Sequence, residues 1–325
     1  MTWLVTGGAG YIGAHVVRAL LDSELPAVVI DDLSGGHREF VPAHVPFVRG
    51  SILDGSLLLR TLEEHSVTGV IHVAGFKYAG VSVQRPLHTY EQNVDGTTVL
   101  LGAMQEVGVD RMVFSSSAAV YGTPDTALVT EDTPKAPESP YGESKLIGEW
   151  LLRDQEIAAG LRHTSLRYFN VVGSGDPAIY DTSPHNLFPL VFDALLEGRT
   201  PRINGSDYPT PDGTNVRDYV HVADIALAHV AAARRLDAGE PIDPAYNLGS
   251  GTGVSVAEIM AAIARVTGIA FTPELGPRRP GDPPRIVASG ERASRDLDWR
   301  MRHTLDEMVS SAWDARRNAG ASLPE

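Results

Sequence analysis

The stretch Gly7-Gly8-Ala9-Gly10-Tyr11-Ile12-Gly13 stands between a short apolar run, Trp3–Thr6, and an amphipathic stretch that continues to Leu21. In this GxxGxxG spacing the first glycine permits a tight turn, the second lets a phosphate group approach the backbone, and the third allows a helix to pack closely on a strand. A helix that begins here presents free amides and a positive dipole end to an anion. The stretch therefore predicts a strand, a phosphate-binding turn and a helix.

A second apolar run, Ala27–Asp31, ends in a carboxylate eighteen residues beyond Gly13. A carboxylate at this position accepts hydrogen bonds from the ribose hydroxyls of adenosine and repels a 2′-phosphate. A glycine motif alone is weak evidence, because ordinary structural turns also produce it. Together with Asp31 it predicts dinucleotide binding, with NAD preferred over NADP.

Short apolar runs and longer amphipathic stretches alternate through the first half of the chain, which is typical of a parallel sheet flanked by helices. The expected strands are Trp3–Thr6, Ala27–Asp31, Pro46–Arg49, Val70–Val73, Met112–Ser115, Thr164–Tyr168 and Tyr246–Leu248. The expected helices are Ile12–Leu21, Leu57–His65, Val94–Val107 and Tyr141–Ala159. The predicted fold class is a doubly wound, Rossmann-type α/β sheet.

Proline and glycine become frequent from about Val171, which indicates a second and smaller lobe. Residues 1–170 and about 222–250 are expected to form the NAD-binding domain. Residues about 171–221 and 251–325 are expected to form a C-terminal substrate-binding lobe.

Composition restricts the function further. The 325 residues include no cysteine, which excludes disulfides and thiolate metal sites, and the histidines form no metal-spaced cluster, so no metal is expected. The formal net charge of −14 and the lack of a basic stripe argue against nucleic acid as a partner. No apolar stretch is long enough for a membrane span and no secretory signal is seen, so a cytoplasmic location is expected. An anionic ligand would need a local basic pocket on so acidic a protein.

The expected fifth strand leads into Ser115-Ser116-Ser117, where open α/β sheets bind their ligands. Further along, Tyr141 and Lys145 are four residues apart and share one face of an expected helix. A free tyrosine has a pKa of about 10, and a nearby ammonium group favours the phenolate. Tyr-x-x-x-Lys alone is common on helix surfaces; combined with Ser117, Asp31 and the glycine turn it indicates a proton-transfer site beside a nicotinamide.

With these motifs in this order, the chain resembles the UDP-glucose (UDP-galactose) 4-epimerase family of extended short-chain dehydrogenases/reductases over essentially its whole length. The matching segments are Leu4–Gly8, Ala74–Lys77, Tyr168–Asn170, Asp207–Thr210, Val216–Val222, Tyr246–Gly249 and Thr304–Met308.

The resemblance implies a role for each matching residue. Tyr141 would be the base, and Lys145 would adjust the pKa of Tyr141 and contact the nicotinamide ribose. Ser117 would orient the substrate hydroxyl, and Asn93 would help to position the Lys145 side of the site. The implied cofactor-binding residues are Gly7, Gly10, Tyr11, Ile12, Gly13, Asp31, Asp32, Ser51, Ile52, Ala74, Lys77, Asn93, Ser115, Tyr141, Lys145 and Tyr168. The implied substrate-binding residues are Lys77, Ser117, Tyr141, Asn170, Asn186, Leu187, Asn204, Arg217, Arg279, Asp282 and Ile286.

The resemblance also implies a reaction, which would be a step of galactose metabolism. Tyr141 would take the proton of the 4-hydroxyl while C4 passes a hydride to NAD. The resulting 4-keto sugar would turn over, with its UDP still anchored, and recover the hydride on its other face. In this family the helices that correspond to Val94–Val107 and Tyr141–Ala159 pair across a homodimer, so a homodimer is expected, with a well-packed monomer as the alternative.

Rival reactions on the same fold are dehydration and decarboxylation of nucleotide sugars. Dehydratases place an Asp-Glu pair after the equivalent of Ser117, and decarboxylases place a glutamate there, whereas this chain has Ala118-Ala119. A methyl group cannot act as an acid or a base. A non-catalytic NAD-binding regulator would have lost Tyr141 or Lys145, and both are present.

Five positions depart from the family pattern. Ser51 replaces an aspartate near the adenine, Asn204 stands where an aromatic often stacks on uracil, Tyr78 and Val81 replace Ala and Glu after the lysine, and Ile286 replaces a tyrosine at the sugar end. The shorter isoleucine predicts a roomier sugar site. Epimerisation of UDP-glucuronate or a UDP-N-acetylhexosamine therefore stays open beside that of UDP-glucose.

Overall fold

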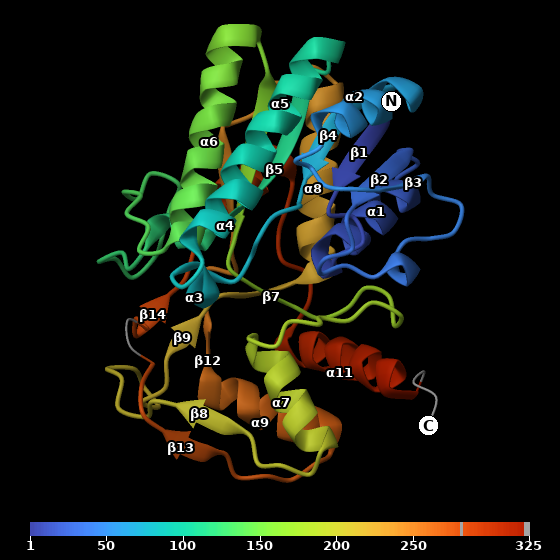
Figure 1. Ribbon diagram of the computed structural model, residues 1–325. Coiled ribbons are helices and arrows are strands. Elements are labelled where there is room, and N and C mark those ends of the chain that lie inside the picture. The colour runs from blue at the N-terminus through green and yellow to red at the C-terminus, as the bar shows by residue number, and fades with distance from the viewer. Residues whose placement is uncertain (280–281, 322–325) are drawn as a thin grey trace.

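The computed structural model describes residues 1–279 and 282–321, and its centre is a sheet of seven parallel strands (Figure 1). The strand order is β11-β6-β5-β4-β1-β2-β3, which places β1 and β4 at the middle of the sheet. The strands are β1 (Thr2–Thr6), β2 (Ala27–Asp31), β3 (Phe47–Arg49), β4 (Val67–His72), β5 (Arg111–Ser117), β6 (Arg162–Tyr168) and β11 (Ala245–Leu248). All seven expected strands are present, and the predicted doubly wound α/β class is confirmed.

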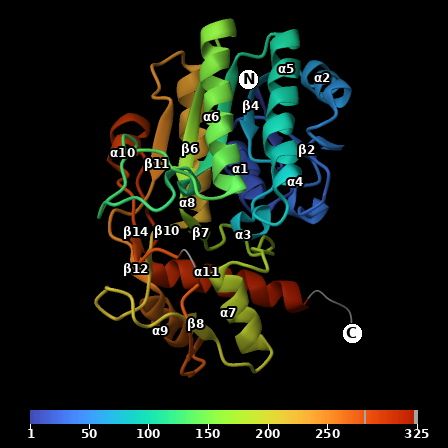
Figure 2. The ribbon, with the colours of Figure 1, turned by 60° about the vertical axis from the view of Figure 1, so that its left-hand side comes forward.

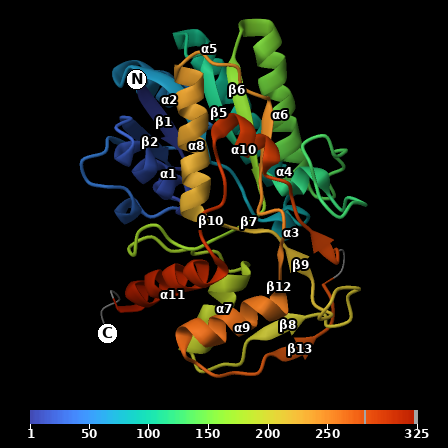
Figure 3. The same cartoon turned by 180° about the vertical axis from the view of Figure 1, so that it is seen from behind.

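Helices cover both faces of this sheet. Helices α1 (Tyr11–Asp22) and α8 (Val222–Asp237) pack together on one face, as the view from behind shows (Figure 3). Helices α2 (Gly55–Glu64), α5 (Gly96–Val107) and α6 (Pro140–Ala159) cover the other face (Figures 1 and 2).

The side chains of β1 show why its three central residues, Trp3, Leu4 and Val5, are all apolar. Trp3 and Val5 join the core beneath α1 and α8, whereas Leu4 joins the core beneath α2 and α5. Successive side chains of a strand point to opposite faces, so a strand buried on both faces has no polar alternation. Burying such side chains on both faces is the main favourable contribution to folding.

The expected helix over Val94–Val107 is longer in the structure. Helical backbone begins with α4 (Pro86–Tyr90), passes through a π-helical turn, η2 (Glu91–Asp95), and continues as α5. Proline suits the first turn of a helix, where its missing amide is not needed. A π turn inserts one extra residue per turn and re-aims the side chains beside it; here it carries Asn93.

The C-terminal lobe is built on a separate core in which Phe192, Ile259 and Trp313 are buried. Its main helices are α7 (Leu187–Leu196), α9 (Val256–Thr267) and α11 (Leu305–Ala321). Its short strands are β8 (Arg202–Asn204), β9 (Val216–Arg217), β12 (Val254–Ser255), β13 (Glu274–Gly276) and β14 (Arg285–Ile286), and β7 (Asn170–Val172) pairs with β10 (Tyr219–His221) between the sheet and the lobe.

Three helices or strands from beyond residue 220 lie on the main sheet. Helix α8 covers its face and β11 forms its edge beside β6. Helix α10 (Glu291–Leu297), from a part of the chain expected in the substrate lobe, packs against both. In residues 1–279 and 282–321 no helix is both long and apolar enough to span a bilayer.

Candidate active site

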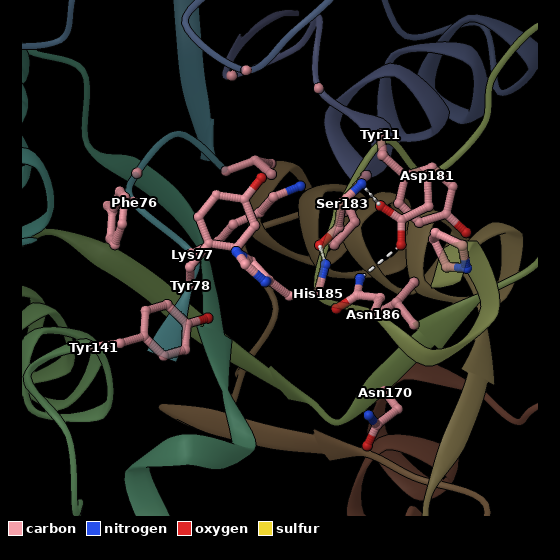
Figure 4. Close-up of a pocket in the computed structure, with 18 of the residues that line it drawn as sticks. Tyr11, Phe76, Lys77, Tyr78, Tyr141, Asn170, Asp181, Ser183, His185 and Asn186 are labelled. Atoms are coloured by element: carbon pink, nitrogen blue, oxygen red, sulfur yellow. Dashed lines mark hydrogen bonds between the residues drawn. The ribbon is translucent and has the colours of Figure 1, made fainter. Parts of the chain in front are cut away.

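A cavity of about 820 Å³ opens at the carboxyl ends of the parallel strands, between the sheet and the C-terminal lobe (Figure 4). Open α/β sheets bind ligands at this edge because the strand order reverses there and leaves a crevice. The expected site residues that line it are Gly7, Gly10, Tyr11, Ile12, Gly13, Asp31, Asp32, Ser51, Ile52, Ala74, Lys77, Tyr141, Lys145, Tyr168, Asn170, Asn186, Leu187, Asn204, Arg217, Arg279 and Asp282. Four expected residues, Asn93, Ser115, Ser117 and Ile286, are not among the residues that line it.

The glycine turn has the conformation that its sequence predicts. Gly7 has a φ of 68°, and a β-carbon added to Gly13 would lie 2.1 Å from the carbonyl oxygen of Gly7. Neither position therefore tolerates a side chain. Gly10 precedes α1, whose first turn holds no acidic residue, so this helix end is open to an anion.

Asp31 holds this turn in place. Its Oδ2 accepts a 2.9 Å hydrogen bond from the amide of Ala9, and its Oδ1 accepts one of 2.8 Å from the amide of Leu33. Burial raises the pKa of Asp31, and the two amides oppose that rise. Each carboxylate oxygen keeps a lone pair, so the side chain can brace the turn and still accept from a ribose.

Tyr141 and Lys145 lie on α6, as their spacing predicts. The helix starts at Pro140. Ser139, which precedes it, caps the helix by accepting a 3.2 Å hydrogen bond from the amide of Gly142. The Lys145 ammonium lies 6.0 Å from the centre of the Tyr141 ring and donates a 2.9 Å hydrogen bond to the carbonyl oxygen of Ser115. The end of β5 therefore fixes the lysine.

Burial dominates the protonation of this pair. It raises the pKa of Tyr141, which a hydrogen bond with Ser117 partly opposes, and it lowers the pKa of Lys145 to about 8. Lys145 was expected to favour the phenolate, but burial outweighs any such effect in this structure. A positive charge at the nicotinamide position would act against burial and lower the pKa of the tyrosine.

Asn93 lies behind the cavity wall and joins two parts of it. Its Oδ1 accepts from the amide of Phe76 at 2.6 Å, and its Nδ2 donates to the Phe76 carbonyl at 3.0 Å and to Ser144 Oγ at 2.8 Å. Ser144 Oγ in turn donates to the carbonyl of Tyr141 at 2.8 Å. Asn93 thus connects the loop that carries Lys77 to the helix that carries Tyr141.

Two serines at the end of β5 also lie behind the wall. Ser117 Oγ accepts from the amide of Ala119 at 3.2 Å, at the start of the short helix η3 (Ala118–Tyr121), and reaches Tyr141 from there. The Ser115 hydroxyl lies 2.8 Å from His229 Nε2, so only its carbonyl serves Lys145.

Positive charge gathers at the lobe end of the cavity. Arg217 forms an ion pair with Asp282, whose other oxygen accepts a 2.8 Å hydrogen bond from Asn215. With its amide oriented to give both groups a partner, Asn204 accepts from Arg279 Nε at 3.2 Å and from Nη2 at 3.3 Å. These guanidinium groups form the local basic pocket that an anionic ligand needs in so acidic a protein.

Ile286 is not among the residues that line the cavity. It lies on β14 and packs against a buried cluster that includes Val120 and Leu146. Phe169, which packs against the same cluster, does line the cavity.

The sequence did not single out several residues of the wall. His185 and Asp181, in the segment before α7, face the cavity (Figure 4). Phe76 and His88 also line it. The Asp181 carboxylate accepts a 2.6 Å hydrogen bond from Asn186. The only available signal for His185 and Asp181 was their closeness in sequence to Asn186. Within the described part of the chain, no group of three or more His, Cys, Asp or Glu side chains is arranged to hold a metal ion.

Residues 3–249 match the model of a family described as the NAD dependent epimerase/dehydratase family. The chain belongs to this family. It is 46% identical to a UDP-glucose 4-epimerase from Azospirillum brasilense, over 98% of this chain and 93% of that protein. The UDP-glucose 4-epimerase of Brucella ovis, solved with NAD, is 38% identical with a TM-score of 0.92 and covers 96% of this chain and 97% of its own.

A second solved relative within this epimerase family is the UDP-glucose 4-epimerase of Bifidobacterium longum, in complex with NAD+ and UDP. It is 35% identical with a TM-score of 0.90, over 99% of this chain and 100% of its own. These matches confirm the predicted family resemblance, the isomerase class and NAD as the cofactor. The glycine turn and Asp31 have the shape and the hydrogen-bonding groups that NAD requires.

Proposed function

We propose that the chain interconverts UDP-glucose and UDP-galactose by NAD-dependent 4-epimerisation, as a step of galactose metabolism. The observation that carries this proposal is that one cavity joins Tyr141 and Lys145 to the glycine turn at one end and to Arg217 and Arg279 at the other. A proton acceptor, a dinucleotide site and a diphosphate site are the parts that such a reaction needs. The names of the relatives support the same reaction.

The cofactor would lie across the glycine turn. Gly7, Gly10 and Gly13 leave room for a pyrophosphate, Asp31 would accept from the adenosine ribose, and Lys145 would contact the nicotinamide ribose. NAD bound there supplies a hydride acceptor for C4 of the sugar and returns the hydride later.

Tyr141 would take the proton of the 4-hydroxyl. Its phenol lines the cavity beside Lys145, as the expected proton acceptor should. Ser117, which is hydrogen-bonded to Tyr141, would orient that hydroxyl. Positioned proton transfer of this kind contributes about 10²–10⁴-fold to a rate.

Arg217 and Arg279 would hold the diphosphate, since a guanidinium pairs with two phosphate oxygens at once. Asp282 would keep Arg217 in position through their ion pair. Asn170 and Asn186, on the same wall, would add amide contacts. With UDP anchored, the sugar can turn and present its other face.

The test is an assay of the purified protein with UDP-glucose, UDP-glucuronate and UDP-N-acetylglucosamine, each without added cofactor. The proposal expects UDP-galactose to form from UDP-glucose, and NAD to be found in the supernatant after denaturation. Conversion of one of the other two sugars, with none of UDP-glucose, would contradict it, and so would an absolute requirement for added NADP.

The proposal includes a homodimer. Four large apolar side chains are exposed on or beside α3 (Ala79–Ser82), α4 and α6: Val83, Leu87, Trp150 and Ile157. Helices α5 and α6 stand side by side at this face (Figure 2). Exposed apolar side chains on neighbouring helices favour association. Leu87→Glu combined with Ile157→Glu should convert a dimer to a monomer in analytical ultracentrifugation.

A cytoplasmic location and a division into two domains complete the proposal. The first domain is 1–170 with about 222–250, to which α10 adds by packing on α8 and β11, and the second is the remainder. Limited proteolysis with and without UDP would test the division, because cleavage should concentrate near residues 171 and 250.

A further inference from the structure

An aromatic group lies in the cavity beside Tyr141 and has no role in the reaction proposed above. Tyr78 meets His185 edge to face, with ring centres 5.1 Å apart and an interplanar angle of 79°. Phe76 packs against Tyr78, with ring centres 5.6 Å apart. In Figure 4 the ring of His185 extends across the cavity toward Tyr78 and Tyr141.

The two rings come from opposite sides of the cavity. Tyr78 follows Lys77 in the loop after β4, at the edge of the main sheet, and His185 lies just before α7 of the C-terminal lobe. Their contact therefore spans the cavity at the end where the sugar would meet Tyr141.

The Tyr78 ring is held from behind, and hydrogen bonds hold the backbone that carries His185. Phe76, which supports Tyr78, is fixed at its amide and carbonyl by Asn93. Its ring also packs edge to face on that of His88, with ring centres 5.3 Å apart. The His185 amide donates to Ser183 Oγ at 3.3 Å. The amide of Ser183 in turn donates to Asp181 at 3.0 Å. A braced wall discriminates by size, because it does not move aside at low cost.

Tyr78 and His185, rather than Ile286, are the candidates to set the size of the sugar end. Both rings belong to residues that line the cavity, whereas Ile286 is not among them.

We infer that the Tyr78–His185 pair narrows the sugar end of the cavity and selects a UDP-hexose without a bulky substituent over one that carries an N-acetyl group. The inference rests on the proposed function and names the substrate class that its site accepts. It is an alternative to the roomier sugar site that Ile286 predicted. Pockets distinguish small differences in size by roughly 10–200-fold in kcat/KM.

The test compares kcat/KM for UDP-glucose and UDP-N-acetylglucosamine in the wild type and in Tyr78→Ala, His185→Ala, Tyr78→Phe and Ile286→Ala. We expect the ratio of N-acetyl to unsubstituted substrate to rise about tenfold or more in Tyr78→Ala and to rise in His185→Ala. Tyr78→Phe keeps the ring and should keep the wild-type ratio.

An unchanged ratio in both alanine variants overturns the inference, as does an equal rise in Ile286→Ala. His185 lies in an exposed segment, so its variant carries the test even where Tyr78→Ala fails to fold. Absence of UDP-glucose turnover in the wild type overturns the proposed function and the inference with it. Turnover of UDP-glucose with an unchanged ratio overturns the inference alone.

Discussion

Asn93 Nδ2 donates a 2.8 Å hydrogen bond to Ser144 Oγ, which ties the π turn before α5 to helix α6 between Tyr141 and Lys145. The same amide group also holds both backbone groups of Phe76. The buried Asn93 side chain therefore fixes the position of the loop that carries Lys77 relative to Tyr141, the proposed base. This makes Asn93 a positioning residue, since it does not line the cavity.

Asn93→Ala should lower both stability and turnover. It leaves buried partners of the amide unpaired, and each such group costs about 1–3 kcal/mol, so the free energy of unfolding in urea should fall by at least that amount. The factor by which kcat falls should exceed the factor by which KM rises, because the Lys77 loop and helix α6 shift relative to one another. Thr98→Ala, whose exposed hydroxyl donates to the carbonyl of Val94, is the matched control. Lost stability with unchanged kcat would reduce Asn93 to a structural residue.

Tyr141→Phe should lower kcat by about 10²–10⁴-fold and leave UDP affinity nearly unchanged. The change removes only the oxygen proposed to accept the proton, and the arginines proposed to bind the diphosphate, Arg217 and Arg279, are separate residues of the cavity wall. Steady-state kinetics and calorimetric titration with UDP would measure both effects. Tyr90→Phe is the control, since the Tyr90 hydroxyl donates to Glu143 and is not among the residues lining the cavity. Near-normal turnover in a folded Tyr141→Phe protein would exclude this tyrosine as the base.

The stability of the protein should depend on pH through Lys145. Burial lowers its pKa from 10.5 to about 8, so between these values the unfolded chain binds more protons than the folded one and stability rises with pH. At roughly 1.4 kcal/mol per pKa unit, the rise is about 3 kcal/mol across this range. This contribution to stability is lost as the pH falls from 10.5 through 8.

Lys145→Met isolates this effect, because methionine does not titrate. The wild-type free energy of unfolding, minus that of the variant, should increase between pH 7 and pH 10.5, whatever the constant offset from the lost hydrogen bond to Ser115. Urea unfolding at several pH values measures the difference. A difference that stays flat, or falls, would mean that Lys145 is not buried as a cation.

The sequence could predict the elements whose residues act locally. The glycine turn and Asp31 sit within one strand–turn–helix unit, so their spacing alone sets their geometry. The strands read as continuous apolar runs because both faces of the sheet are covered. Tyr141 and Lys145 share a helix face for the same kind of reason, four residues being close to one turn.

Relations between distant segments could not be predicted in this way. Ile286 lies on a two-residue strand, and its direction depends on pairing with β9 and on packing against the cluster of Val120 and Leu146. The contact of Tyr78 with His185 needs the loop after β4 and the segment before α7 to meet across a cavity. The π turn at Asn93 leaves no mark in the helical pattern, because it changes the backbone by one residue only.

The last prediction concerns Asn204, which stands where the family often has an aromatic residue. Its amide oxygen accepts from the Arg279 guanidinium, so the asparagine would support the diphosphate site through the arginine. Asn204→Ala should weaken UDP binding about fivefold, since a partly exposed hydrogen bond to a charged group contributes about 1 kcal/mol. Arg279→Ala should weaken it more. If Asn204 acts only through Arg279, the double variant should bind UDP no more weakly than Arg279→Ala, because the shared interaction is already lost. Calorimetric titration of all four proteins measures this coupling. Losses that simply add would show that Asn204 contributes independently of Arg279, for example by direct contact with the nucleotide.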